Sequence, residues 1–409
     1  MQLRTQSFLA LAGVVCIPVL LAARPAAAPG PLTFTTPGQA VVIPFLLRNN
    51  HILVRGRVND SDSLWFFLDT GASDQLLDLR TVQRLGLLTG EGAHVLGAGG
   101  AVQGRTVSDV RIRLPGLELR DPMVPAISLE SMARQTGHAC DGILGFDVFN
   151  GAVVEIDYAR STLTLHEPAR FKKPVAASVI PITLKENHPY VTARATLAGG
   201  KPIAGQYVID TGSNMALLFS SGFAQDHRVV EAMPRTLQVR LGGVGGPTMC
   251  PQGRFARLEL GPYTLPGPVA TIQQGGAGRV SLPDAAGNIG GDILSHFTVT
   301  FDYAHKQMFL APGPWFDRPF EADMSGLVLS VRDDSTSALN VFLVQPQSPA
   351  AEAGIAAGDL LERIDGQAVA PGDIVDVRQR FRAEGRTFHV GLRRGGAHSE
   401  VTFTTRRLI

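Results

Sequence analysis

The stretch FLDTGAS at residues 67–73 decides how this sequence of 409 residues is interpreted, because it occurs a second time. The second copy is VIDTGSN at residues 208–214, so the two aspartates lie 210 − 69 = 141 residues apart. Each copy ends an apolar run typical of a buried strand and enters a tight turn. A single turn of this kind is compatible with a structural Asx turn, whereas two copies at matching places indicate a functional role for the two aspartates.

Other blocks of the sequence repeat in the same order. Three pairs recur at a constant offset of 302 − 157 = 145 residues: LGAGG with LGGVG (96–100 and 241–245), GILGFD with GNIGGD (142–147 and 287–292), and IDYA with FDYA (156–159 and 301–304). Together with the doubled Asp-Thr-Gly turn, they predict a duplicated lobe of about 140 residues, an ordinary domain size.

Both lobes are predicted to be mainly β. The sequence has 45 glycines, 27 prolines and few aromatic residues, a composition that favours strands and turns over helices. Hairpins are predicted at 153–165 and 299–310. The glycine-rich segments near 97 and 242 are interpreted as hairpin tips and not as phosphate loops, because no third glycine and no helix follow.

The chemistry is expected to lie in the two turns. If the lobes pack about a pseudo-two-fold axis, the carboxylates of Asp69 and Asp210 face each other there. Two close carboxylates do not both ionise readily, so such a pair shares one proton. The carboxylate can then activate a water molecule while the carboxylic acid protonates a peptide carbonyl, which is general acid–base hydrolysis.

At these residues the sequence resembles the aspartic peptidases in their bacterial, single-chain, retropepsin-like form. The resemblance implies a bilobal fold of two β-barrel-like lobes, residues 31–170 and 171–314, with Asp69 and Asp210 as the catalytic dyad. It implies that the other residues of the turns support the dyad, with the two threonines bonded across it: Thr70, Gly71, Ala72, Thr211, Gly212 and Ser213. The segments 142–145 and 287–290 would buttress the turns, although Asn288 replaces an apolar residue of the family pattern.

The same resemblance implies two flaps over the substrate. They would comprise the glycine-rich tips Gly97, Ala98, Gly99, Gly100, Gly242, Gly243, Val244 and Gly245. Neither tip contains the tyrosine of pepsin-type flaps, so the retroviral type is the closer match.

The two turns differ in one residue, Ala72 in the first and Ser213 in the second. A hydroxyl can donate a hydrogen bond to a carboxylate and a methyl group cannot. We therefore expect Asp210 to be the more acidic partner and Asp69 to carry the shared proton, with Ser213→Ala raising the acidic limb of the pH–rate profile.

A different unit follows a proline-rich junction at 311–319. Residues 348–366 contain a short helical segment, a glycine stop, an apolar strand and an Asp-Gly turn. This pattern resembles the PDZ domains attached to bacterial envelope proteases and covers residues 321–409, a small α/β unit. It implies a loop at Ser325, Gly326 and Leu327 whose N–H groups bind the carboxylate of a C-terminal peptide.

The N-terminus is typical of a secretory signal over residues 1–28. Arg4 precedes an apolar run at 8–22 and three alanines at 26–28. A membrane anchor is the competing interpretation, but the run is shorter than the roughly 20 residues that a spanning helix needs. Removal of the signal also removes Cys16 and leaves Cys140 and Cys250 in an oxidising compartment, periplasmic or extracellular, where the sequence leaves their pairing open.

Other classes of protein fit the sequence poorly. A net charge of +1 without long charge runs gives no nucleic-acid surface. Residues 287–291 read GNIGG, with isoleucine where a GNSGG serine protease has its nucleophile, and no histidine pair has metal-ligand spacing. We expect no metal and no cofactor, a peptide or protein substrate, and a monomer, since one chain supplies both aspartates. The main alternative is a catalytically silent, two-lobed scaffold that binds peptides.

Overall fold

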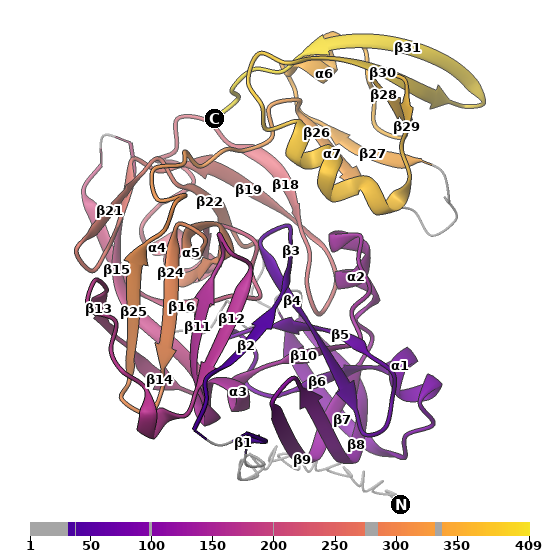
Figure 1. Ribbon diagram of the computed structural model, residues 1–409. Helices are drawn as coiled ribbons and strands as arrows, with labels where there is room; N and C mark the ends of the chain where they lie inside the picture. The colour runs from indigo at the N-terminus through magenta and orange to yellow at the C-terminus, as the bar shows by residue number, and fades with distance from the viewer. Residues whose placement is uncertain (1–31, 37, 98–99, 199, 275–284, 332–337) are drawn as a thin grey trace, which may run out of the picture.

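The computed structural model describes residues 32–36, 38–97, 100–198, 200–274, 285–331 and 338–409. Two lobes lie side by side, and a smaller C-terminal unit packs at one end of them (Figure 1). The chain is mainly β, as the sequence predicts. No helix in the described ranges is both long and apolar enough to cross a membrane. The predicted signal, residues 1–28, lies outside these ranges.

Lobe one is built on a nine-stranded sheet whose strand β5 (Leu64–Leu68) leads into the first Asp-Thr-Gly turn. This apolar strand is largely buried because β4 (His51–Val58) pairs on one side and β10 (Gly142–Leu144) on the other. β10 runs parallel to β5 and antiparallel to β6 (Leu76–Asp78), so it crosses behind the turn. The other elements of this lobe are β1 (Leu32–Phe34), β3 (Leu46–Arg48), β7 (Thr89–Gly97), β8 (Gly100–Leu114), β9 (Leu117–Ile127), α1 (Leu79–Arg84), α2 (Glu130–Thr136) and α3 (Phe146–Gly151).

Lobe two repeats this arrangement in a ten-stranded sheet. Strand β16 (Pro202–Asp210) ends at the second Asp-Thr-Gly turn and pairs in parallel with β23 (Gly287–Gly290). β23 is in turn antiparallel to β17 (Leu217–Phe219), as β10 is to β6. The other elements are β14 (Thr183–Lys185), β15 (His188–Thr196), β18 (Leu237–Leu241), β19 (Thr248–Arg254), β20 (Arg257–Leu260), β21 (Tyr263–Pro266), β22 (Val269–Ile272), α4 (Ser221–Asp226) and α5 (Gly291–Leu294).

The two lobes share a third sheet of six strands. Its order is β13-β25-β24-β11-β12-β2, so each lobe contributes three strands. The predicted hairpins are here as β11 (Val153–Asp157) with β12 (Thr162–His166), and β24 (Phe297–Asp302) with β25 (Gln307–Pro312). The lobes join where β11 pairs antiparallel with β24. The remaining elements are β2 (Val41–Pro44), β13 (Ser178–Pro181) and the short helix η1 (Pro168–Arg170).

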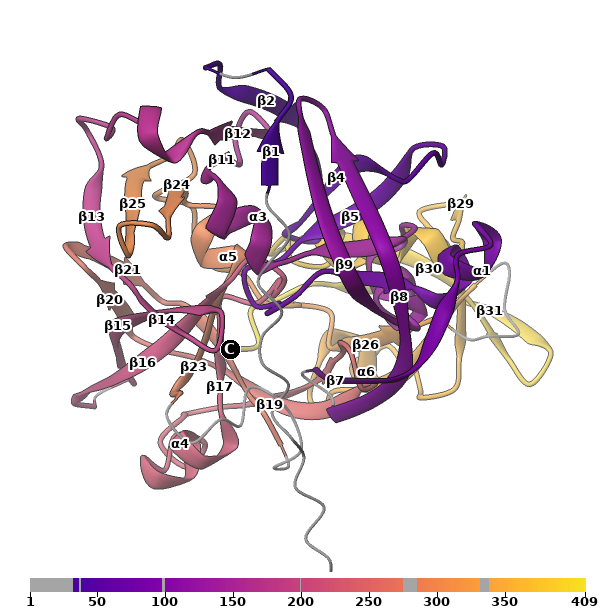
Figure 2. The ribbon, with the colours of Figure 1, turned by 90° about the horizontal axis from the view of Figure 1, so that it is seen from below.

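One hydrophobic core extends through both lobes and this shared sheet. Phe149 of lobe one and Phe301 of lobe two meet edge to face within it, with ring centroids 5.4 Å apart. Figure 2, turned to view the molecule from below, shows the long strands β8 and β9 on the outer side of lobe one, away from this junction.

The C-terminal unit has its own six-stranded sheet and its own core. The helix, strand and turn predicted at 348–366 are present as α6 (Pro349–Glu352), β28 (Leu360–Ile364) and a turn in which Asp365 and Gly366 have positive φ angles of 52° and 78°. The other elements are β26 (Leu327–Ser330), β27 (Leu339–Val344), β29 (Gln367–Ala368), η3 (Pro371–Asp373), α7 (Ile374–Arg380), β30 (Thr387–Arg394) and β31 (Ala397–Thr404).

This unit is attached to both lobes. On lobe one, Arg48 forms an ion pair of 3.1 Å with Asp376 of α7. On lobe two, the side-chain amide of Gln345 pairs with the backbone of Gln238 in β18, accepting from its N–H at 3.1 Å and donating to its carbonyl at 2.5 Å. The guanidinium of Arg240, also in β18, lies 5.3 Å above the ring of Phe342. The C-terminal unit therefore holds the strand β18 directly.

Cys140 and Cys250, whose pairing the sequence leaves open, are both free and buried. They belong to two separate apolar clusters, one in each lobe. Burial raises the pKa of both thiols, which keeps them protonated and unreactive.

Candidate active site

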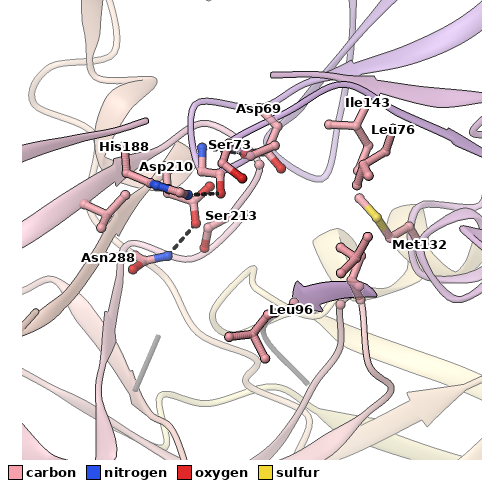
Figure 3. A pocket seen from close by; sticks show the side chains of 18 of the residues that line it. Asp69, Ser73, Leu76, Leu96, Met132, Ile143, His188, Asp210, Ser213 and Asn288 are labelled. Carbon is pink, nitrogen blue, oxygen red and sulfur yellow. Dashed lines mark hydrogen bonds between the residues drawn. The ribbon is translucent and has the colours of Figure 1, made fainter. Parts of the chain in front are cut away.

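The two Asp-Thr-Gly turns meet between the lobes, as predicted. The carboxyl groups of Asp69 and Asp210 are hydrogen-bonded to each other and open onto a cleft of about 340 Å³. Figure 3 shows them side by side at one wall of this cleft. Within its own turn, Asp69 Oδ1 accepts the N–H of Gly71 at 2.7 Å.

Glycine at the third position of each turn allows this close approach. A Cβ atom on Gly71 would lie 2.7 Å from Asp210 Oδ1, and one on Gly212 would overlap with the carboxyl group of Asp69. Each glycine thus packs against the aspartate of the opposite lobe.

Thr70 and Thr211 cross-link the two turns. The N–H of each threonine donates to the hydroxyl of the other at 3.0 Å. The hydroxyl of Thr70 donates to Ile209 O at 2.7 Å, and that of Thr211 donates to Leu68 O at 2.9 Å. Both side chains are buried, so these four bonds form a symmetrical clamp behind the carboxyl groups.

The segments predicted to support the turns contact them directly. Behind the first turn, Leu144 O accepts the N–H of Asp69 at 2.9 Å, and Ala72 O accepts from Phe146 at 3.0 Å. Behind the second, Ser213 O accepts the N–H of Gly291 at 2.6 Å. A side chain at Gly145 or Gly290 would strike backbone oxygens of these turns, so both glycines are required by space.

The hydrogen bonding of the dyad is asymmetric, through a residue that we did not expect. Asn288 Nδ2 donates to Asp210 Oδ2 at 2.5 Å, whereas lobe one has Ile143 at the matching position. Ser213 contributes its backbone N–H to Asp210. Its hydroxyl, the donor expected from the sequence, accepts instead from Met215 N–H at 3.4 Å, because the turn directs it back toward its own chain.

Burial raises the pKa of both carboxyl groups. For Asp69 the nearby charge of Asp210 adds to the effect of burial and holds the pKa well above its usual range. For Asp210 the hydrogen bonds from Asn288 and from the turn oppose burial. The surroundings therefore raise the pKa of Asp69 more than that of Asp210, and the side-chain donor to Asp210 is Asn288 and not the hydroxyl of Ser213.

Sequence reasoning missed an Asn-His pair that precedes each turn. Asn187 donates to Ser73 O at 3.2 Å, and His188 Nε2 lies 3.0 Å from Gly71 O, both in the turn of the opposite lobe. Asn50 donates to Asn214 O at 3.2 Å, and His51 contacts the carbonyl of Gly212. The signal was present as Asn-His at 50–51 and 187–188. It was concealed because the spacing to the aspartate differs, 69 − 51 = 18 against 210 − 188 = 22 residues.

The predicted flap tips lie together over the cleft. Gly97 is the last residue of β7 and Gly100 the first of β8, while Ala98 and Gly99 between them are outside the described residues. The second tip follows β18, and Gly97 packs so closely on Val244 that a side chain at Gly97 would overlap it. Apolar side chains line the cleft: Leu76, Leu96, Met132, Ile143, Leu218 and Leu241. The first four are labelled in Figure 3.

Helix α2 connects the second flap to the C-terminal unit. Ser131 Oγ donates to Gly243 O at 3.2 Å, and Gln135 packs against Gly242. The same helix contacts α7 and η3. Among the residues that the structure describes, no group of three His, Cys, Asp or Glu side chains is placed to hold a metal ion.

Comparison with known families agrees with this geometry. An aspartyl protease family model matches residues 54–148, and a PDZ domain model matches residues 342–394. The chain carries an aspartyl protease domain and a PDZ domain. No curated protein matches the sequence at a significant level. The aspartyl protease match covers the first Asp-Thr-Gly turn, and the second turn repeats its strand pairing and its threonine contacts in lobe two.

In the PDZ domain, the loop predicted to bind a peptide carboxylate already holds an internal one. The N–H groups of Ser325 and Gly326 donate to Asp323 Oδ1 at 3.0 and 2.7 Å. Leu327 N–H donates to Ser325 Oγ at 3.0 Å. A peptide carboxylate would have to displace Asp323 to use these donors.

Proposed function

We propose that this protein is an aspartic endopeptidase that hydrolyses peptide bonds with water activated between Asp69 and Asp210. The observation that supports the proposal is the pair of carboxyl groups held together by two duplicated turns at an apolar cleft. A catalytically silent scaffold would have no need to keep two buried, mutually repelling carboxyl groups in contact.

In the proposed reaction, ionised Asp210 accepts a proton from a water molecule as the water oxygen attacks the peptide carbonyl carbon. Protonated Asp69 donates its proton to the carbonyl oxygen, so a neutral tetrahedral diol forms. The diol then collapses as the C–N bond breaks: Asp210 donates its proton to the leaving nitrogen, and one diol hydroxyl gives its proton to Asp69, which restores the starting dyad. The flap tips at Gly97 and Val244 cover the cleft and exclude bulk water.

The test is cleavage of a peptide library by the purified chain without its first 28 residues. We expect Asp69→Asn and Asp210→Asn each to reduce kcat/KM by at least about 10²- to 10⁴-fold, because each removes half of the acid–base pair. Asp226→Asn, at the end of helix α4, is the matched control and is expected to retain activity. A folded wild-type protein that cleaves no peptide, with a PDZ domain that binds peptides, would favour the scaffold.

We propose that the PDZ domain recruits substrates by their C-termini and that the N-terminal segment directs export. Because Asp323 occupies the loop donors, Asp323→Ala is expected to tighten binding of a C-terminal peptide with a free carboxylate and not of the same peptide amidated. Equal binding of both peptides would place recognition elsewhere. The N-terminal sequence of the mature protein tests the export signal.

A further inference from the structure

Asn288 is an amide at the floor of an otherwise apolar part of the cleft. It lies in β23, opposite Val208 of β16 and Leu218 of β17, and its side chain is buried. Among the described residues, its side-chain amide has one hydrogen-bond partner, Oδ2 of Asp210. In Figure 3 the dashed line that starts at Asn288 marks this bond.

A purely structural role does not account for this amide. The matching position in lobe one is occupied by Ile143, which packs into the apolar cluster beside Asp69. An apolar residue therefore satisfies the same fold position, and burying an amide there is unfavourable unless its hydrogen bonds are used. The bond to Asp210 is the use that the structure provides.

We propose that Asn288 is a positioning residue that fixes the negative charge of the singly protonated dyad on Asp210 and leaves the proton on Asp69. The inference rests on the proposed peptidase function and deepens it. Asn288 Nδ2 is a donor that cannot lose its proton near neutral pH, so it stabilises the ionised form of Asp210. In the part of the chain that the structure describes, Asp69 receives no equivalent side-chain amide, and the dyad is thereby polarised before substrate binds.

Other titratable groups surround the dyad: His51 and His188 at the glycine carbonyls, Tyr303 behind Asp69, Asp74 in the cleft wall, and Asp292 bonded to Asn50. Burial lowers the pKa of His51 to about 4 and raises that of Tyr303 well above its ordinary value, so both stay neutral through the mid-pH range. Asp292 and Asp74 are present in the wild type and in every variant at position 288. A comparison of each variant with the wild type therefore controls for both residues.

The proposal predicts which limb of the pH profile depends on Asn288. The acidic limb reports the first proton lost by the dyad, and the basic limb reports the second. Asn288 stabilises the ion formed in the first step and contacts the same ion after the second. Removal of the Asn288 donor should therefore shift the acidic limb to higher pH and leave the pH of the basic limb nearly unchanged.

The experiment compares kcat/KM against pH for a fluorogenic peptide that the wild type cleaves. Asn288→Leu removes the donor and keeps the same number of side-chain heavy atoms, Asn288→Gln keeps an amide on a side chain one methylene longer, and Ile143→Leu is the matched change in lobe one. We expect the acidic limb to rise by about one pH unit in Asn288→Leu. It should return toward wild type in Asn288→Gln and stay unchanged in Ile143→Leu.

A loss of activity at every pH with an unmoved acidic limb would overturn the proposal and leave Asn288 a structural residue. Carbon-13 titration of the aspartate carboxyl groups gives a second readout that needs no turnover. In the wild type the Asp210 carbon should respond to the first deprotonation, and in Asn288→Leu that step should occur at higher pH. If the wild type cleaves no peptide, the peptidase function fails, while this titration still decides the role of Asn288.

Discussion

Gly212 shows how little space the two Asp-Thr-Gly turns leave around single atoms. Even one methyl group on this residue would overlap with the carboxyl group of Asp69. We expect Gly212→Ala to separate the dyad and to reduce kcat/KM by at least about 10²-fold, since small displacements of catalytic groups have effects of that size.

The matched control for this substitution is Gly222→Ala in helix α4. A Cβ atom at Gly222 meets nothing within 4 Å, so activity should be retained there. Full activity in Gly212→Ala would mean that the turns can move apart without loss, against the close contact described above.

His51 makes stability depend on pH. Its pKa is lowered to about 4 by burial, from 6.5 in an exposed histidine. Between these values the unfolded chain binds a proton that the folded protein excludes, so stability is complete above pH 6.5 and is lost as the pH falls toward 4. The shift corresponds to at most about 3 kcal/mol.

Urea unfolding of the wild type and of His51→Gln between pH 4 and pH 7 measures this contribution. As the pH is lowered from 7 to 4, the unfolding free energy of the wild type should decrease more than that of His51→Gln. His227→Gln, at an exposed histidine, should follow the wild type. Parallel curves for wild type and His51→Gln would contradict the assignment.

The candidate site could be predicted from sequence only where a residue type has one obvious chemistry. Asp69 and Asp210 were identified because Asp-Thr-Gly occurs twice, each time at the end of an apolar strand, which indicates a pair of carboxyl groups. Asn288 looked like a departure from an apolar pattern, since no sequence feature shows that its amide faces Asp210. His51 and His188 were missed because single histidines carry no chemical signature until their neighbours are known.

At the scale of secondary-structure elements, the clamp between Thr70 and Thr211 holds the ends of strands β5 and β16 together across the two lobes. Thr70→Ala removes the acceptor of Thr211 N–H and the donor to Ile209 O, and leaves both groups buried. We expect a loss of about 1–3 kcal/mol in unfolding free energy for each group left unpaired, and a large loss of activity. Thermal unfolding and peptide cleavage measure the two effects.

Thr70→Ser is the control for the clamp, because it keeps the hydroxyl and removes only a methyl group. It should retain most of the stability and activity. If Thr70→Ser lost as much as Thr70→Ala, packing of the methyl group and not hydrogen bonding would explain the position.

Local patterns predicted individual elements well and their pairing poorly. The hairpins β11–β12 and β24–β25 follow from alternating residues around short turns, and the flap tips follow from glycine. The pairing of β11 with β24 was not predicted, because it joins residues such as Ile156 and Val299 that are far apart in the sequence. No local propensity specifies such a contact.

At the scale of the whole molecule, the PDZ domain restrains the strand that leads to one of the two predicted flap tips. Gln345 holds the backbone of Gln238 in β18, the strand that leads to the second flap tip. Gln345→Ala should loosen this strand and raise KM by up to about tenfold, since two hydrogen bonds of about 0.5–1.5 kcal/mol each are lost. Faster hydrogen exchange in β18 would show the loosening directly.

Gln379→Ala, on the exposed side of α7, is the control for this prediction and should change neither quantity. An unchanged exchange rate in Gln345→Ala would mean that β18 is held without Gln345, by its pairing with β19 and by the contact between Arg240 and Phe342. The PDZ fold itself was predictable from residues 348–366. The position of the PDZ domain beside β18 was not predictable, because it depends on contacts between surface side chains of the PDZ domain, lobe one and lobe two.

The shared six-stranded sheet has a consequence for a chain cut between the lobes. A fragment ending near residue 170 would keep Asp69 but leave the β11 edge, which pairs with β24 over Val154–Asp157, without a partner. Open strand edges recruit other strands, and a second copy of β11 can pair with the first in the antiparallel sense, in the place that β24 takes in the full chain. We expect this fragment to assemble into a two-fold homodimer, measurable by sedimentation, whose centre brings together two copies of Asp69.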